Sequence, residues 1–226
     1  MDEITIDGVT YVEKRYRNDI CYAIRKVNSS ADKIEIPDFI LQTPVVYVED
    51  YAFDSLPVES VILPGCIRCL STNSFFNCPN LKHIKIKPRS YDVYGISFEQ
   101  NTFDGCPIES IDASDHQLTL HPIAFENCAS LEEIRGQIKY IDKNAIAGCK
   151  KLKQLVFCDG ASAFSYAFGK NHLEMVVFRG KIYLAKSALN ALREATIFCT
   201  EEFSHLDLVY NGWNIAVKPA TELPYN

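Results

Sequence analysis

The sequence lacks several features that would point to a particular environment or partner. No stretch approaches the roughly 20 apolar residues that a membrane-spanning helix needs, so we expect no membrane insertion. The first ten residues, MDEITIDGVT, contain acids and no apolar run, which argues against a signal peptide. Basic residues are not in excess either, since 23 Lys and Arg face 29 Asp and Glu. Nucleic-acid binding is therefore disfavoured, because proteins of that class usually carry a basic patch.

Sequence motifs of catalysis are also missing. The chain has no glycine-rich phosphate loop, no G-x-S-x-G and no H-E-x-x-H. Cys66 and Cys69 form a single C-x-x-C pair with His83 downstream, whereas a zinc site of this kind needs a second pair. We predict no enzyme, with no catalytic residue, no metal and no cofactor. A metal-dependent enzyme that uses Cys66 and Cys69 stays as a remote alternative.

What the sequence does contain is an internal repeat. Seven segments share an apolar anchor, and successive anchors are 22, 28, 22, 21, 22 and 21 residues apart. The anchors are Phe53, Phe75, Phe103, Phe125, Ile146, Phe168 and Leu189. A small residue precedes each anchor, and a run such as VESVIL (58–63) follows it, which is typical of a strand with one buried face. This period predicts a solenoid in which each coil packs on the next.

The pattern Ala-Phe-x-x-Cys-x-x-Leu-x-x-Ile-x-Ile resembles the BspA-type leucine-rich repeat over residues 31–199. The resemblance implies a leucine-rich-repeat solenoid: a curved right-handed superhelix of the β-rich α/β class. It implies parallel strands on the concave face, with short turns or 3-10 and helical pieces on the convex side. Members of that family are mostly bacterial and protist surface or effector-like proteins, so the resemblance also implies protein binding or adhesion. It supplies no catalytic residues.

The array and both of its ends are expected to form one continuous domain. Residues 31–199 hold about seven repeats, beginning with the run IEIP (34–37). Residues 1–30 are predicted to be a β-hairpin cap made of two strands, at 4–13 and 20–27. Such a cap is expected because the terminal units of a solenoid must differ from the repeating ones.

Residues 200–226 are predicted to be a C-terminal cap and tail. EEFSHLDLVYNGW (201–213) has the pattern of a short amphipathic helix, and WNIAV (213–217) gives a last strand.

The nine cysteines indicate free thiols rather than a disulfide framework. Four of them occupy one repeat column, three residues after the anchor: Cys78, Cys106, Cys128 and Cys149. Leu56 and Leu192 fill the same column, so it predicts a buried apolar filler. A catalytic pair of Cys128 with His121 or His116 is disfavoured, because Cys128 lies in this buried column and a nucleophile there is inaccessible. Free thiols favour a reducing compartment, so we expect a cytoplasmic protein, with a cell-surface or secreted location as the alternative.

Candidate partner-binding residues are those strand positions that point away from the core. The middle of this surface is charged, with Lys85, Asp112 and Arg135. Its C-terminal third is apolar, through Val156, Met175, Val177 and Phe198. Exposed contiguous apolar surface often marks an interface; the alternative is that a cap or a second copy covers it. The six extra residues between Phe75 and Phe103 give a second candidate, which contains Tyr91 and Tyr94.

These observations predict a non-catalytic interaction module that binds a protein partner of unknown identity on its concave face. The alternative is an adhesive or structural segment of a surface protein, which binds a host protein or a glycan.

Overall fold

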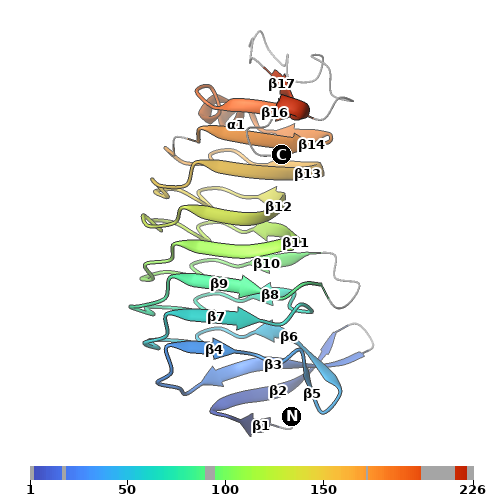
Figure 1. Cartoon of the computed structure of the whole chain (residues 1–226), viewed down its shortest axis with the longest axis vertical. Helices are drawn as coiled ribbons and strands as arrows, with labels where there is room; N and C mark the ends of the chain where they lie inside the picture. The colour runs from blue at the N-terminus through green and yellow to red at the C-terminus, as the bar shows by residue number, and fades with distance from the viewer. Residues whose placement is uncertain (1–2, 17–18, 90–94, 172, 200–216, 223–226) are drawn as a thin grey trace.

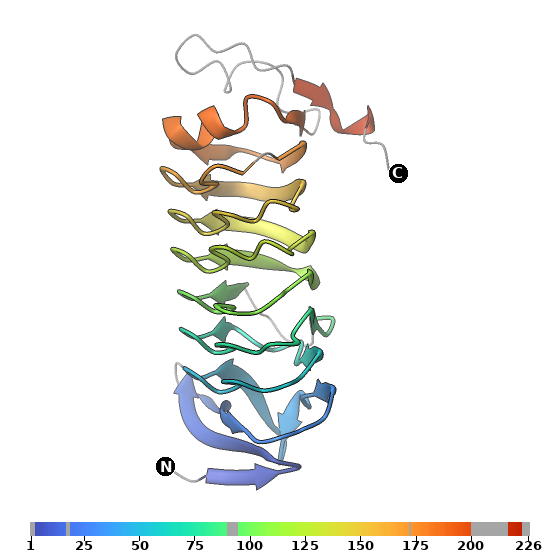
Figure 2. The same ribbon diagram turned by 90° about the vertical axis from the view of Figure 1, so that its left-hand side faces the viewer.

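The computed structural model describes residues 3–16, 19–89, 95–171, 173–199 and 217–222. Within these ranges the chain is a β-solenoid whose coils stack in sequence order along one axis (Figures 1 and 2). The solenoid that the repeat predicts is therefore confirmed.

One side of the stack is a parallel ladder that we call ladder A. It contains the strand runs predicted after the anchors. Its rungs are β4 (Lys33–Glu35), β7 (Ser60–Leu63), β9 (His83–Ile86), the first parts of β11 (Ser110–Leu120), β12 (Glu133–Ile141) and β13 (Gln154–Ala163), then β14 (Met175–Arg179), β16 (Thr196–Cys199) and β17 (Val217–Pro219).

A second parallel ladder, ladder B, forms where the sequence predicted turns. Its rungs are β3 (Asp19–Val27), β6 (Thr43–Val48), β8 (Cys69–Leu70), β10 (Ile96–Phe98), the later parts of β11, β12 and β13, and β15 (Ile182–Leu184). The cause is a short alternation before each anchor, in which buried Leu118 and Leu120 flank the half-buried Thr119. This period of two is the pattern of a strand with one buried face.

The third side of each coil is a turn that carries the anchor. Six of the seven anchors lie in such turns, and Leu189 lies instead in the helix α1 (Lys186–Ala191). All seven anchors are buried, as the repeat predicted. Phenylalanine rings of adjacent coils stack, with centroid distances of 4.5 Å for Phe53–Phe75 and 5.1 Å for Phe103–Phe125. The core is thus a continuous column of like side chains.

Each turn begins with a residue in the left-handed region, two positions before the anchor. Asn73, Asn101 and Asn144 have φ of 55°, 54° and 57° there. Asparagine tolerates this conformation better than most residues do. Ile123 has φ 57° at the same place, although a β-branched side chain is strained there. The turn geometry therefore repeats even where its sequence does not.

The amino-terminal end has three antiparallel strands where the sequence predicted two. β1 (Glu3–Ile6) and β2 (Val9–Tyr16) are joined at Asp7 and Gly8, and β2 pairs with β3. Asp7 and Gly8 have φ of 48° and 78°, which is the Asp-Gly turn favoured in two-residue hairpins. That dipeptide divides the single strand predicted at 4–13.

Short elements complete the described chain. β5 (Phe39–Ile40) pairs antiparallel with β6, and η1 (Ala220–Glu222) follows β17. The helix predicted at 201–213 and most of the strand predicted at 213–217 lie outside the described residues. Among the helices that are described, none is long and apolar enough to cross a membrane.

Candidate interaction surfaces

The outer face of ladder A holds the columns that the sequence assigned to partner binding. Lys85 pairs with Asp112, and Asp112 pairs with Arg135, on successive rungs. Val156, Val177 and Phe198 likewise occupy matching positions on β13, β14 and β16. Between β12 and β13 the pairing is irregular, so the charged and apolar parts of the face belong to separately registered segments.

The charged middle of ladder A is largely occupied by its own ion pairs. Arg135 Nε lies 2.8 Å from Glu133 Oε1, and Arg135 Nη1 lies 3.8 Å from Asp112 Oδ2. The hydrogen bond to Glu133 raises the pKa of the Arg135 guanidinium. His83 Nδ1 lies 2.9 Å from Ser110 Oγ on the next rung. These contacts pair Arg135 with Glu133 and Asp112, so much of the charge on this face is already partnered.

The prediction that Val177 and Phe198 are exposed is wrong. Each is 4% exposed, whereas Val156 and Met175 are partly exposed. Val177 lies between Val156 and Phe198 in the ladder, and β17 adds a rung beyond Phe198 with Lys218 opposite it. Apolar side chains stacked in this way cover one another. The exposed apolar patch inferred from the sequence is therefore reduced to Val156 and Met175.

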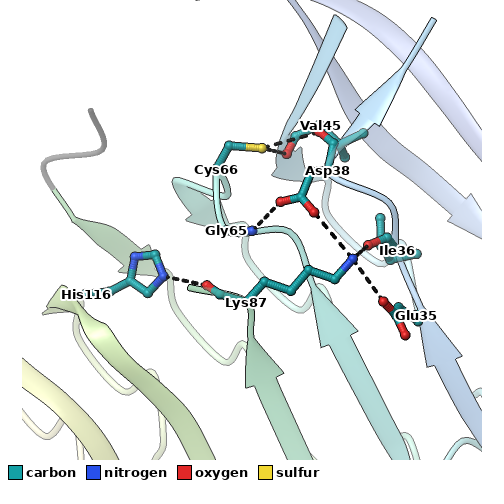
Figure 3. Close-up of polar contacts among 8 residues, drawn as sticks. All are labelled: Glu35, Ile36, Asp38, Val45, Gly65, Cys66, Lys87 and His116. Carbon is teal, nitrogen blue, oxygen red and sulfur yellow. Dashed lines mark hydrogen bonds and ion pairs between the residues drawn. The ribbon is translucent and has the colours of Figure 1, made fainter. Parts of the chain in front are cut away.

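The other candidates from the sequence are in different surroundings. Tyr91 and Tyr94 lie outside the described residues. Cys66 is buried, and its Sγ lies 3.3 Å from Val45 O and 3.4 Å from Asp38 O (Figure 3). Cys69 Sγ instead lies 3.8 Å from Glu99 Oε1. The two thiols of the C-x-x-C pair thus have different neighbours, and no His, Cys, Asp or Glu cluster suited to a metal occurs within the described ranges.

The cysteine column lies in the core, with Cys106 partly exposed. Three of its four thiols have a role that the sequence did not suggest, because each donates toward the backbone carbonyl of the anchor in the preceding coil. Cys78 Sγ lies 2.9 Å from Phe53 O, Cys106 Sγ 2.9 Å from Phe75 O and Cys149 Sγ 3.1 Å from Phe125 O. Asn171 in the same column donates its side-chain amide to Ile146 O. All nine cysteines of the chain are free.

The Cys–His pairs considered from the sequence do not form. Burial raises the pKa of the Cys128 thiol, which keeps it protonated. His121 Nε2 lies 3.4 Å from Glu99 Oε1, and His116 Nε2 lies 3.0 Å from Lys87 O. Both imidazoles are therefore engaged elsewhere.

The outer face of ladder B is different in character, because aromatic side chains gather at its C-terminal end. We call Tyr140, Phe164 and Tyr183 the aromatic strip. Tyr140 pairs with Ser162 and Ser162 with Tyr183 on successive rungs. The ring centroids of Tyr140 and Phe164 are 4.9 Å apart. Phe164 is 46% exposed and Tyr183 57%, so two large aromatic side chains of the strip lie open to solvent.

Polar groups border the aromatic strip at both ends. The Tyr140 hydroxyl donates to Asp142 Oδ2 at 3.0 Å, and the Tyr140 ring lies 6.2 Å from that of His121. Beyond His121 the face becomes polar, because His121 is in contact with the carboxylate of Glu99. At the other end, Lys181 Nζ lies 5.5 Å from the centre of the Tyr183 ring. The strip is thus an aromatic surface with polar groups at both ends, and binding patches commonly have such a polar rim.

Sequence reasoning missed the aromatic strip because it considered only the runs that follow the anchors. The signal was present in the residue six positions before each anchor, which reads Tyr47, Cys69, Ser97, Thr119, Tyr140, Ser162 and Tyr183. Alternation places this column on the outside of its strand.

Comparison with known proteins agrees with this architecture. The model for the BspA type leucine rich repeat region matches residues 28–132 and 95–193, in six copies. None of the curated proteins matches the chain. Among solved structures, the leucine-rich repeat protein TpLRR of T. pallidum has 19% identity and a TM-score of 0.53. That match covers 85% of this chain and 95% of TpLRR.

Two further bacterial structures are similar. A leucine rich cell surface protein from Faecalibacterium prausnitzii has 19% identity and a TM-score of 0.48, with 90% of this chain covered. This chain spans about half of that protein, 52% of its length. A leucine-rich repeat protein from Bacteroides ovatus has 16% identity and a TM-score of 0.35, covering 87% of this chain and 70% of its own. Since the family model matches most of its length, this chain belongs to the BspA-type leucine-rich repeat family.

Proposed function

We propose that the protein is a non-catalytic module that binds a protein partner, and that the aromatic strip is its main contact surface. The family supports the general role, because leucine-rich repeat proteins are generally protein-interaction or surface-protein modules. The observation that carries the choice of surface is the exposure of Phe164 and Tyr183 beside Tyr140.

The chemistry of the strip suits a protein partner. Tyrosine is enriched among the residues that contribute most to protein interfaces. Aromatic side chains bury a large area and lose little conformational entropy, since they have only two side-chain torsions. The strands beneath the strip are held in parallel register, so little further ordering is needed on binding.

Ladder A is the weaker candidate for the main contact, although its residues extend the possible footprint. Arg135 and Asp112 already satisfy each other, and a partner would have to replace those contacts. Lys85, Val156 and Met175 are at least partly exposed and remain candidates for a secondary contact. Val177 is unsuitable as a test position, because an aspartate there would bury a charge.

The proposal is tested with two matched double variants, used beside the wild type as bait in lysate from the protein's own source. Phe164→Ser/Tyr183→Ser removes the strip, and Lys85→Ser/Arg135→Ser alters ladder A. Each variant should stay folded, because exposed substitutions usually change stability by about 0.5 kcal/mol or less.

Any protein retained is then titrated against all three forms. We expect the strip variant to bind it at least about tenfold more weakly, a loss of about 1.4 kcal/mol, and the ladder A variant to lose much less. Equal loss in both variants, or loss in the ladder A variant alone, would overturn the choice of surface. Retention of a glycan in place of a protein would favour the adhesive alternative.

We also propose that the protein works in a reducing compartment, the cytoplasm. The supporting observation is that all nine cysteines are free and that most are buried. The alternative is an exported surface protein. Thiol counting on protein isolated from its source under alkylating conditions separates the two, since disulfides there would contradict the proposal.

A further inference from the structure

A chain of polar contacts crosses four successive coils at the corner between ladders A and B (Figure 3). In the first coil, Asp38 Oδ1 accepts from the Gly65 amide of the second coil at 2.8 Å. Lys87, just after β9 in the third coil, places its Nζ 3.4 Å from Asp38 Oδ2 and 3.0 Å from Glu35 Oε1. Lys87 O is in turn 3.0 Å from His116 Nε2, on β11 of the fourth coil.

His116 is the terminal member of this chain, and it is the unusual one. It is 3% exposed. Because Lys87 O can only accept, Nε2 must carry the proton in the neutral ring, and Nδ1 is then a bare acceptor. That Nδ1 is buried and has no hydrogen-bond partner. A proton added to Nδ1 would produce a buried cation with an unpaired donor, which is costly.

The charged groups around His116 do not remove this cost. The hydrogen bond to Lys87 O and the charge of Asp115, its neighbour on β11, favour the protonated ring, whereas Arg89, which follows β9, opposes it. The ammonium group of Lys87 is directed away, toward Glu35 and Asp38. Burial has the largest effect, and the pKa of His116 lies below its ordinary value.

We propose that His116 is an acid-sensitive latch, which holds the corner after β9 against β11 when neutral and releases it when its Nδ1 is protonated. The sign follows from proton binding. His116 binds a proton at Nδ1 less readily when the corner is closed than when it is open. In the open state the histidine has an ordinary pKa near 6.5. Latching is complete above that pH and weakens as the pH falls toward the pKa of the closed state. In that window, uptake of one proton shifts the opening equilibrium about tenfold per pH unit.

Hydrogen exchange of the full chain, followed between pH 7.5 and 5 and corrected for intrinsic exchange rates, tests the latch. The decisive variant is His116→Gln, whose side-chain amide can still donate to Lys87 O but does not titrate. We expect the amides of Lys87, Arg89 and residues 114–118 to lose protection on acidification in the wild type and to keep it in the variant. His83→Gln is the matched control, because His83 is exposed and pairs with Ser110, and it should respond as the wild type does.

The same loss in His116→Gln as in the wild type, or no loss in either, would overturn the latch. A second readout needs no variant: the ring resonance of His116 in the wild type should titrate below the ordinary histidine pKa of about 6.5. Titration at the same or a higher pH would refute the inference even if the variant failed to fold. Because His116→Gln keeps Glu35 and Asp38 unchanged, it separates their contribution from that of His116.

Discussion

The interior of this solenoid repeats from coil to coil, whereas its outer surface does not. Inside, anchors stack on anchors and thiols donate to anchor carbonyls in one coil after another. Outside, ladder A carries paired charges and ladder B ends in the aromatic strip. The difference teaches that the columns where coils agree hold the fold together. The columns where they disagree are the ones available for recognition.

Phenylalanine occurs in both regions, so the same substitution can be compared in the interior and on the outer face. Phe103→Ala should destabilise the protein by about 3–5 kcal/mol, because it opens a cavity between two stacked rings. Phe164→Ala, on the outer face, should change stability by about 0.5 kcal/mol or less. Urea unfolding of both variants measures the two free energies. Similar losses in both would remove the distinction between interior and surface.

The second-largest change in stability is expected at Ile123, which occupies the left-handed turn position two residues before an anchor. Ile123→Asn should stabilise the protein by about 1–2 kcal/mol, because asparagine accepts the left-handed backbone that three other coils fill with asparagine. The reverse change, Asn101→Ile, should cost a similar amount. A lower urea midpoint for Ile123→Asn would mean that packing of the isoleucine outweighs the strain.

A second exception is a hydroxyl in the small-residue column. Ser74 Oγ is buried and has no hydrogen-bond partner, whereas alanine fills this column in five of the coils. Ser74→Ala should raise stability by about 1 kcal/mol. Thr102→Ala is the matched control and should lower it, because Thr102 Oγ1 donates to Glu99 O at 2.7 Å. Thermal unfolding of both variants decides whether the two signs are opposite.

The smallest effect is expected for the charges on ladder A. Arg135→Gln should change stability by less than about 0.5 kcal/mol, because its ion pairs are exposed to solvent. The change should shrink further in 1 M salt, where exposed pairs are screened. A larger loss, insensitive to salt, would show that this face is part of the repeating structure after all.

How far the sequence predicts this molecule follows from the same contrast. Burial of the seven anchors, from Phe53 to Leu189, was predictable because the period of the repeat fixes which side chains face the core. Exposure of Val177 and Phe198 was predicted wrongly, since packing within that apolar column and the additional rung β17 decide it, and neither belongs to the repeat. The column that holds Tyr140 and Tyr183 was visible in the sequence, but only the structure shows that a second ladder forms there and brings the two residues onto one face. His116 gave no signal, because its partner is a backbone carbonyl 29 residues away.

The most direct test of the central claim is to locate the partner on one of the two outer faces. A photo-activated crosslinking residue is placed at Tyr183, on the aromatic strip, or at Arg135, on ladder A, and each form is irradiated in its bound complex. The account predicts a covalent product with the partner from position 183 and little or none from position 135. Crosslinking from position 135 alone would contradict it and return the binding site to ladder A.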